Sequence, residues 1–261
     1  MSRHSGSKRP SGSSGPASPF ENSGDRAVEL ELSPDLVMLA DRQSPAAERF
    51  IRLKADLAVD MPIKPKVLVI TSPMPGDGKS FVAINLALAL AADRETRTLL
   101  IDADLRRPGL HYRLRPAPET GLVEVLAGKA RLEQAVEKTD VPGLHVLASP
   151  HRAEDPGRVL AGSGPRELIG SLREDYDRIV IDTPPAVAFA DAELIAGSSD
   201  GVILVTRSWV TPRHALEEAI GTIRAAPLLG IVLNAATANL LDRAHDYDRC
   251  YYEYQRRSDK R

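Results

Sequence analysis

The sequence predicts an α/β fold in which helices cover both faces of a parallel sheet. From Val67 onward, short apolar runs that are typical of buried strands alternate with stretches that have apolar residues at helical spacing. The first run is joined to the first such helix by a glycine-containing turn. Two later runs end in aspartate. These features place several polar groups at the carboxyl edge of the sheet, where ligands bind in such folds.

The glycine-containing turn, residues 71–78, links the strand-like run Val67–Ile70 to a helix that opens with Lys79 and Ser80. Strand, glycine loop and helix in this order form the context that a phosphate-binding loop requires. Backbone amides and the helix N-terminus then converge on one anion site. An ordinary strand-to-helix turn would explain one glycine, but not two glycines with Lys and Ser at this spacing. The predicted nucleotide-binding residues are Pro75, Gly76, Asp77, Gly78, Lys79, Ser80 and Phe81.

The loop departs from the common phosphate-loop pattern at one position, because Pro73 stands where that pattern has Gly. Lys79 is predicted to reach the β- and γ-phosphates, and the Ser80 hydroxyl to ligate Mg²⁺. The sequence therefore predicts binding of ATP with Mg²⁺ at a variant P-loop, in a single P-loop NTPase domain.

The remaining elements follow from hydrophobic periodicity and from turn residues. A helix is expected from Ser44 to about Val59, with apolar residues at Phe50, Leu53 and Leu57. The predicted strands are Val67–Thr71, Thr98–Asp102, Leu144–Leu147, Arg178–Asp182, Gly201–Thr206 and Leu229–Asn234. The predicted helices are Lys79–Asp93, Gly121–Leu126, Arg131–Glu137, Pro165–Glu174, Ala190–Gly197 and Pro212–Ala225.

The two ends of the chain differ from this central region in composition. Residues 1–43 are predicted to be a disordered N-terminal arm, because their beginning is rich in Ser, Gly and Pro and poor in apolar residues. Residues 44–240 form the predicted catalytic domain, in which 44–60 is a candidate oligomerisation helix. Residues 241–261 are predicted to be a flexible tyrosine-rich tail.

The composition of the chain argues against several classes of function. The net charge of −2 and the pI near 6.3 give no general case for a nucleic-acid partner. A single cysteine, Cys250, excludes an intramolecular disulfide and a multi-cysteine metal site within one chain. The longest apolar run, 81–92, is shorter than the roughly 20 residues that span a bilayer. We therefore expect a cytoplasmic protein that reaches the membrane through a partner.

Carboxylates end two further strands. Asp102 and Asp104 follow the run Leu99–Ile101, and Asp182 follows Ile179–Ile181. Asp182 fits the acidic residue that supports Mg²⁺ in nucleotide-hydrolysing loops. Asp102 and Asp104 are two residues apart, so they face the same side in extended backbone. One of them could support the metal while the other accepts a proton. Aspartate also ends many strands simply as a turn residue, but three strand ends that all supply phosphate or metal groups weaken that alternative.

Three motifs together resemble those of the bacterial tyrosine kinases, the autokinases of capsule and exopolysaccharide loci. They are TSPMPGDGKS, LLIDADLRRP and IVIDTPP, and in that family they correspond to the Walker A, A′ and Walker B motifs. The likeness covers roughly Ser44 to the C-terminus, about five-sixths of the chain. It implies that Lys79 binds phosphate and that Ser80, Asp102 and Asp182 support Mg²⁺. It further implies that Asp104 activates the attacking tyrosine.

The resemblance extends to the tail, because the family usually ends in a tyrosine cluster. Four of the six tyrosines lie in the last fifteen residues. Charged residues interleave with them without an apolar period, which favours a flexible substrate segment over core aromatics. The expected autophosphorylation sites are Tyr247, Tyr251, Tyr252 and Tyr254.

The family also implies partners. Its oligomer-forming helix typically carries Glu followed by two basic residues at intervals of three. Here Glu48 and Lys54 fit, but Ile51 replaces the first basic residue. The resemblance implies a homo-oligomer, a transmembrane activator of the polysaccharide co-polymerase type that recruits the chain to the inner face of the membrane, and a tyrosine phosphatase.

Two other functions share these motifs. The MinD/ParA group of ATPase switches carries a signature lysine early in the loop, at the position of Met74 in this chain. A nucleotide-gated scaffold of polysaccharide export, without significant kinase activity, would carry the same motifs as a kinase. Only an activity assay separates the scaffold from the kinase.

Overall fold

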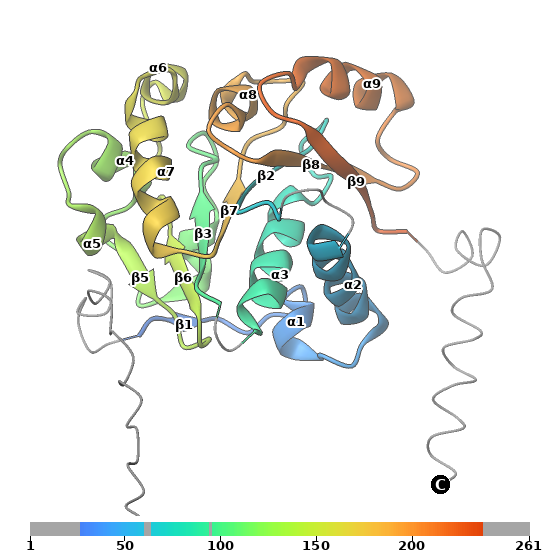
Figure 1. Ribbon diagram of the computed structural model, residues 1–261, viewed down its shortest axis with the longest axis horizontal. Coiled ribbons are helices and arrows are strands. Elements are labelled where there is room, and N and C mark those ends of the chain that lie inside the picture. Colours follow the sequence, from blue (N-terminus) through green and yellow to red (C-terminus); the bar gives the residue numbers. More distant parts are fainter. Residues whose placement is uncertain (1–26, 60–63, 94–95, 237–261) are drawn as a thin grey trace, which may run out of the picture.

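A computed structural model describes residues 27–59, 64–93 and 96–236. Its centre is a seven-stranded sheet with helices on both faces (Figure 1). The strand order across the sheet is β5-β6-β3-β7-β2-β8-β9. The strands are β2 (Val67–Thr71), β3 (Thr98–Asp102), β5 (Val136–Lys138), β6 (Leu144–Leu147), β7 (Arg178–Asp182), β8 (Gly201–Arg207) and β9 (Leu228–Asn234).

Parallel pairing brings three strand ends together. β7 lies between β2 and β3, with Asp182 opposite Ile70 on one side and opposite Asp102 on the other. Every pairing in this sheet is parallel except that of β5 with β6. The phosphate loop and both predicted carboxylate motifs therefore lie at the carboxyl edge of adjacent strands, as the sequence predicts.

Side chains that alternate along β2 pack into two separate cores, one on each face of the sheet. Leu68 and Ile70 point into a core with α1 (Val37–Ala40), α2 (Pro45–Val59) and α3 (Lys79–Ala91). Val67 and Val69 point into the opposite core. That second core is covered by α4 (Leu122–Leu126), α5 (Leu132–Ala135), α6 (Pro156–Ala161), α7 (Gly164–Asp175), α8 (Asp191–Ala196) and α9 (Arg213–Thr222).

The helix that follows the phosphate loop is buried on all sides. Every residue of α3 from Val82 to Ala91 is buried, because the sheet lies under one side and α1 and α2 cover the other. Asn85 is the one polar residue in that stretch, and its amide bonds to the backbone of Asp35, Met38 and Phe81. The phosphate loop is thus mounted on a rigid, fully packed helix.

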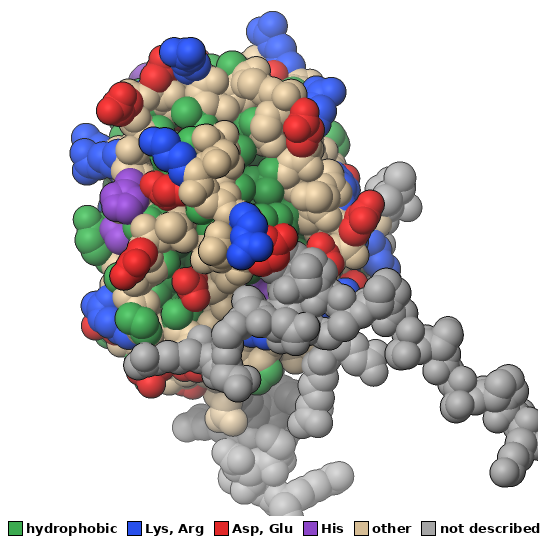
Figure 2. Space-filling model, turned by 90° about the vertical axis from the view of Figure 1, so that its left-hand side faces the viewer, with side chains coloured by type: hydrophobic (Ala, Val, Ile, Leu, Met, Phe, Trp, Pro, Cys, Tyr) green, Lys and Arg blue, Asp and Glu red, His purple; other side chains and the backbone are tan. Residues whose placement is uncertain are grey.

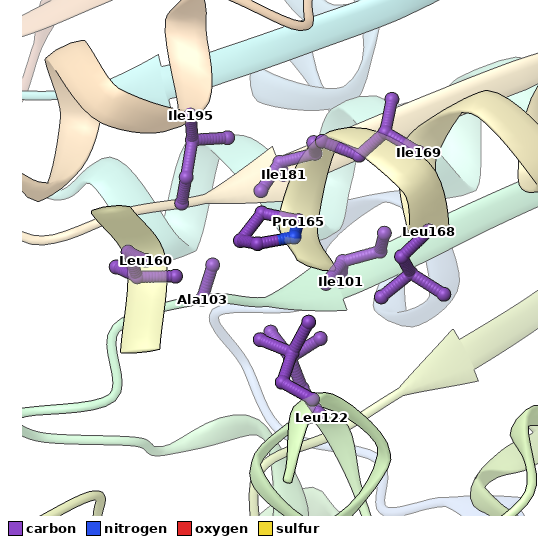
Figure 3. Close-up of a pocket in the computed structure, with 10 residues that line it drawn as sticks. Ile101, Ala103, Leu122, Leu160, Pro165, Leu168, Ile169, Ile181 and Ile195 are labelled. Atoms are coloured by element: carbon purple, nitrogen blue, oxygen red, sulfur yellow. The ribbon is translucent and has the colours of Figure 1, made fainter. Parts of the chain in front are cut away.

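A small cavity lies between the sheet and the helices of the second core (Figure 3). It measures about 20 Å³, and its walls are apolar side chains that include Ile101, Ile181, Ile195 and Leu160. A space this small and apolar could hold at most a water molecule, which would find no polar partner there. We interpret it as a packing defect and not as a ligand site.

The N-terminal region corrects one sequence prediction. Residues 27–43, assigned to a disordered arm, belong to the fold: β1 (Glu29–Leu30) pairs with β4 (Leu114–Arg115), and Leu36 and Met38 are buried. Nine of these seventeen residues are apolar, a signal that was missed because the segment was grouped with the Ser-, Gly- and Pro-rich residues before it. Leu36 and Met38 pack in the core that contains α3, and the Met38 N–H donates to Asn85. Residues 1–26 lie outside the described residues.

A second correction concerns residues 131–137. The predicted helix Arg131–Glu137 is a single turn, α5, after which Val136–Lys138 forms the antiparallel edge strand β5. Val136 is buried in the second core, so strand pairing and burial override the local helical pattern. The other predicted elements are found within a few residues of their expected bounds, while the 3₁₀ helix η1 (Leu110–Arg113) and α6 were not anticipated.

On the face that Figure 2 shows, basic and acidic side chains are interspersed among apolar ones. The described ranges contain no helix long and apolar enough to cross a membrane.

Candidate functional site

The phosphate loop, residues 72–78, has the backbone shape that glycine requires. Gly76 and Gly78 adopt left-handed φ angles of 87° and 99°. A Cβ at Gly78 would lie 1.9 Å from the side-chain nitrogen of Asn234, whereas a Cβ at Gly76 would meet nothing within 4 Å. A side chain at position 78 is therefore disfavoured both by the backbone conformation and by lack of space, and at position 76 by the backbone conformation alone.

The buried Asp77 stabilises the phosphate loop through hydrogen bonds. Its side chain is 1% exposed, and one carboxylate oxygen accepts the backbone N–H of Met74 at 2.9 Å. The other oxygen accepts the hydroxyl of Thr211 at 2.6 Å. Its carbonyl oxygen accepts the Asn234 amide at 2.9 Å. The Asp77 side chain thus shapes the loop, and the predicted binding of phosphate by Asp77 would have to use its backbone N–H.

Lys79, the first residue of α3, lies among carboxylates. Its Nζ is 2.7 Å from Asp104 Oδ2, 3.6 Å from Asp182 Oδ1 and 3.3 Å from Ser80 Oγ. Burial disfavours the charged ammonium, but the charges of Asp182 and Asp104 outweigh it and raise the pKa of Lys79 above its usual value. The lysine therefore stays charged and compensates the nearby carboxylates.

Asp182, at the end of β7, faces both Lys79 and Ser80. The Ser80 hydroxyl donates to Asp182 Oδ2 at 2.5 Å. The other oxygen, Oδ1, is buried and has no hydrogen-bond partner among the described residues. Burial raises the pKa of Asp182, and the Lys79 charge opposes that rise. The Oδ1 atom lies 3.6 Å from the Lys79 ammonium, beyond hydrogen-bond distance. A buried carboxylate oxygen with acceptor capacity left, beside a serine hydroxyl, suits a hard cation such as Mg²⁺.

Asp102 lies one strand away, at the end of β3, and its carboxylate is bonded to backbone. One oxygen accepts the N–H groups of Gly109 and Leu110, each at 2.9 Å, and the other accepts the N–H of Asp104 at 3.2 Å. Burial, followed by the charge of Asp182, raises the pKa of Asp102 to about 7. Asp102 therefore organises the chain that follows β3, and its predicted support of a metal stays a prediction.

Asp104 is brought to the site by that chain. Its Oδ1 accepts the backbone N–H of Arg107 at 3.0 Å, and its Oδ2 forms the ion pair with Lys79. The structure therefore brings together Lys79, Ser80, Asp104 and Asp182, and places Asp102 beside them. The four tail tyrosines, Tyr247, Tyr251, Tyr252 and Tyr254, lie outside the described residues.

The contacts of Arg106 differ from those that its place in the motif LLIDADLRRP suggests. An arginine that follows the second carboxylate motif could neutralise phosphate, but the Arg106 guanidinium forms two 2.9 Å bonds to the buried Asp191 at the start of α8. The guanidinium also lies 4.0 Å above the Phe189 ring. This bidentate pair ties the chain after β3 to the chain after β7.

Three residues that the sequence analysis missed support the loop from the β8–β9 side: Arg207, Thr211 and Asn234. The Arg207 guanidinium lies 3.5 Å from the Gly76 carbonyl oxygen. Arg207 and Asn234 both end apolar strands, so the strand-end signal that identified the aspartates would also have identified them.

A groove of about 580 Å³ continues from the loop toward the outer side of α3. Phe81 and Val82 form one wall, α2 contributes Arg49 and Phe50, and the end of β9 contributes residues 232–236. Its size falls within the range of small-molecule sites. Asn234, which lines the groove, donates to the Asp77 carbonyl oxygen, so the groove lies beside the phosphate loop.

The chain resembles known proteins over this whole region. An AAA domain family model matches residues 65–226. The tyrosine-protein kinase YwqD of Bacillus subtilis is 33% identical over 77% of this chain and 85% of its own length. The succinoglycan biosynthesis transport protein ExoP of Rhizobium meliloti is 34% identical over 70% of this chain. The chain spans 24% of ExoP and at most 30% of the first three curated relatives.

Solved structures agree with the sequence relatives. The kinase domain of the Escherichia coli tyrosine kinase ETK superposes with a TM-score of 0.72 at 26% identity, over 81% of this chain and 91% of that one. The cell division ATPase MinD of Pyrococcus furiosus reaches a TM-score of 0.55 over 64% of this chain. The predicted P-loop fold is thereby confirmed, with kinase domains fitting over more of the chain than MinD does. The chain belongs to the bacterial tyrosine-protein kinase family.

Proposed function

We propose that this chain is a protein-tyrosine autokinase that transfers the γ-phosphoryl group of ATP to its own C-terminal tyrosines and thereby regulates exopolysaccharide synthesis and export. The observation that carries the proposal is the convergence of Lys79, Ser80, Asp104 and Asp182 within one hydrogen-bonded cluster beside the phosphate loop. The relatives named as tyrosine kinases support this activity over that of a switch ATPase.

The residues present fit a bound Mg²⁺. Ser80 and Asp182 would hold it, and it would neutralise charge on the phosphate oxygens. No group of three or more His, Cys, Asp or Glu side chains within the described ranges is arranged to hold a metal by itself. The protein therefore supplies part of the ligand set, and nucleotide phosphates would supply the rest, as is usual for Mg²⁺.

The chain's own residues perform the transfer in this proposal. The amides of residues 75–81 cradle the phosphates, and Lys79 leaves Asp104 to bind the β- and γ-phosphates. Asp104, released from its ion pair, accepts the proton of the tyrosine hydroxyl. The phenolate oxygen forms a bond to the γ-phosphorus as the bond to the bridging oxygen of ADP breaks. Lys79 thus keeps Asp104 in an ion pair until nucleotide binds.

The tail supplies the acceptors in this proposal. Each phosphotyrosine adds roughly −1.5 to −2 charges near neutral pH. Phosphorylated tails would therefore repel one another and the acidic site, which would loosen an assembly of several copies. The partners that fit this function are a polysaccharide co-polymerase that holds the chain at the inner face of the membrane, and a tyrosine phosphatase that resets the tail.

The function is tested by incubation of the purified full chain with labelled ATP and Mg²⁺, followed by mapping of phosphotyrosine. Lys79→Met should remove labelling while the fold, measured by circular dichroism, stays intact. Replacement of the four tail tyrosines by Phe should remove most labelling but leave nucleotide binding unchanged. Equal labelling of wild type and Lys79→Met would refute the loop assignment. Full labelling of the Phe variant would make the exposed Tyr112 the next candidate acceptor, whereas Tyr176 is buried.

A further inference from the structure

Trp209, the chain's single tryptophan, lies in the turn between β8 and α9 and is 84% exposed. Its φ angle of 61° is left-handed, a conformation that is rare for bulky side chains. The next residue, Val210, is 60% exposed. The turn thus accepts backbone strain without burying the indole, and such outliers point to a function.

This turn is attached to the phosphate loop. The Thr211 hydroxyl accepts the Arg207 backbone N–H at 2.8 Å and donates to Asp77 at 2.6 Å. Asp77 in turn holds the backbone of Met74, whose side chain is 40% exposed. Trp209 is therefore presented from a fixed position beside the loop.

The chain leaves the described fold at the same place. The Ser208 N–H donates to the Asn234 carbonyl oxygen at 2.9 Å, so the residue before Trp209 is bonded to the end of β9. The described part ends two residues later, at Ala236. Residues 237–261, which contain four tyrosines and five arginines, therefore follow a point of the chain that is two residues from this hydrogen bond.

We propose that Trp209 and Val210 form a docking surface for the same chain's residues 237–261. Tyrosine rings stack on an indole, and arginine guanidinium groups bind to its face. Tyr247 is eleven residues beyond Ala236, a stretch that can span about 36–40 Å. A segment tethered at this distance has an effective concentration in the millimolar range, so a weak contact is sufficient.

Docking gives the substrate segment of the proposed function a binding surface, and in that respect it rests on that function. It requires no phosphate transfer, however. The experiment is therefore done without nucleotide, and its failure would leave the kinase activity untouched.

The test uses the fluorescence of Trp209 in the full-length chain, with acrylamide as quencher. Replacement of Tyr247, Tyr251, Tyr252 and Tyr254 by Ser should raise the quenching constant roughly twofold, because the indole loses its cover. Tyr112→Ser is the matched control, since Tyr112 is 69% exposed on η1, outside the tail; it should change nothing. Equal quenching in all three proteins would overturn the proposal. Quenching that rises on dilution would also overturn it, because the cover would then come from another copy.

A second measurement follows the rate of trypsin cleavage within residues 237–261. Trp209→Gly removes the indole and suits the left-handed backbone, so it should fold at least as well as wild type. Trypsin should then cut after Arg249 several-fold faster than in wild type, while cleavage within the folded domain stays slow. Unchanged cleavage after Arg249, with Trp209→Gly folded, would refute the docking.

Discussion

Two groups of residues hold the phosphate loop, and they use different chemistry. On the β3–β7 side, Asp102, Asp104 and Asp182 crowd around Lys79, and burial raises the pKa of both Asp102 and Asp182. On the β8–β9 side, Thr211 donates a hydrogen bond to the Asp77 side chain at 2.6 Å, and Asn234 donates one to its carbonyl oxygen at 2.9 Å.

The comparison separates function from stability. The β3–β7 side buries more carboxylates than its one lysine can neutralise, which costs folding free energy but leaves charge available for a phosphate and a cation. The β8–β9 side has its hydrogen bonds satisfied and fixes the loop in place. Changes on the first side should therefore alter chemistry and the pH dependence of stability, and changes on the second should chiefly alter stability.

The largest effect is expected from Asp104→Asn. The substitution keeps size and polarity but removes the charge that accepts the tyrosine proton, so phosphotransfer should fall about 10²- to 10⁴-fold. Nucleotide binding should persist, because Ser80 and Asp182 remain. Single-turnover transfer and nucleotide titration measure the two quantities, with the exposed Asp93→Asn as control. A parallel loss of binding would make Asp104 a metal-supporting residue.

The free energy of unfolding should depend on pH because the buried carboxylates change protonation. Asp102 has a pKa near 7 in the fold against 3.8 for an ordinary aspartate. The folded state therefore binds more protons at Asp102 between these values, and the Asp102 contribution to stability should fall as pH rises from about 4 to 7, by up to about 4 kcal/mol. Burial lowers the pKa of His145 to about 4, which acts in the opposite direction over the same range, so the Asp102 contribution is the difference between wild type and Asp102→Asn. Urea unfolding of the nucleotide-free chain at several pH values measures this. Asp102→Asn should flatten the slope, and an unchanged slope would assign it to other groups.

Gly78→Ala tests the β8–β9 side. The new Cβ would overlap Asn234 and also force Ala into a left-handed conformation, so unfolding should become easier by about 2–3 kcal/mol. Gly76→Ala is the matched control: its φ is also positive but its Cβ meets open space, so it should cost only about 1 kcal/mol. Equal losses in urea unfolding would show that conformation alone matters and that Asn234 gives way.

The sequence predicts the β3–β7 side of the site well, because each of its groups directly follows an apolar strand. Parallel strand ends meet at one edge, so the order of the motifs along the chain is enough to place Asp102, Asp104 and Asp182 near Lys79. The direction of each side chain was not predictable. Asp77 turns inward to Thr211, a hydroxyl that lies 134 positions away in the sequence, and Arg106 binds Asp191 across 85 positions.

The misassigned N-terminal region shows a different limit. Nine of the seventeen residues 27–43 are apolar, and Val28, Leu30 and Leu32 alternate with glutamates, so a strand signal is present. Grouping this segment with the Ser-, Gly- and Pro-rich residues before it hid that signal. Its tertiary support was not predictable: the Met38 N–H donates to the Asn85 side chain, which donates to the Asp35 carbonyl oxygen. The bounds of β9 were predicted to within one residue, because its apolar run is broken only by Gly230.

The smallest effect is expected at α2, which lies beside the β9 end of the groove. Its inner face packs on α3, where Phe50 meets Phe81 with ring centres 5.6 Å apart, while Ile51 is 39% exposed on the outer face. If this face joins two copies, Ile51→Arg should strengthen the contact by about 1 kcal/mol or less, since exposed ion pairs contribute little. Sedimentation velocity at several concentrations would show a shift toward larger species, and the shift should fade in molar salt, where charges are screened beyond about 3 Å. Glu48→Ala should weaken association in the same assay. If neither substitution changes the sedimentation, α2 serves only to cover its own α3.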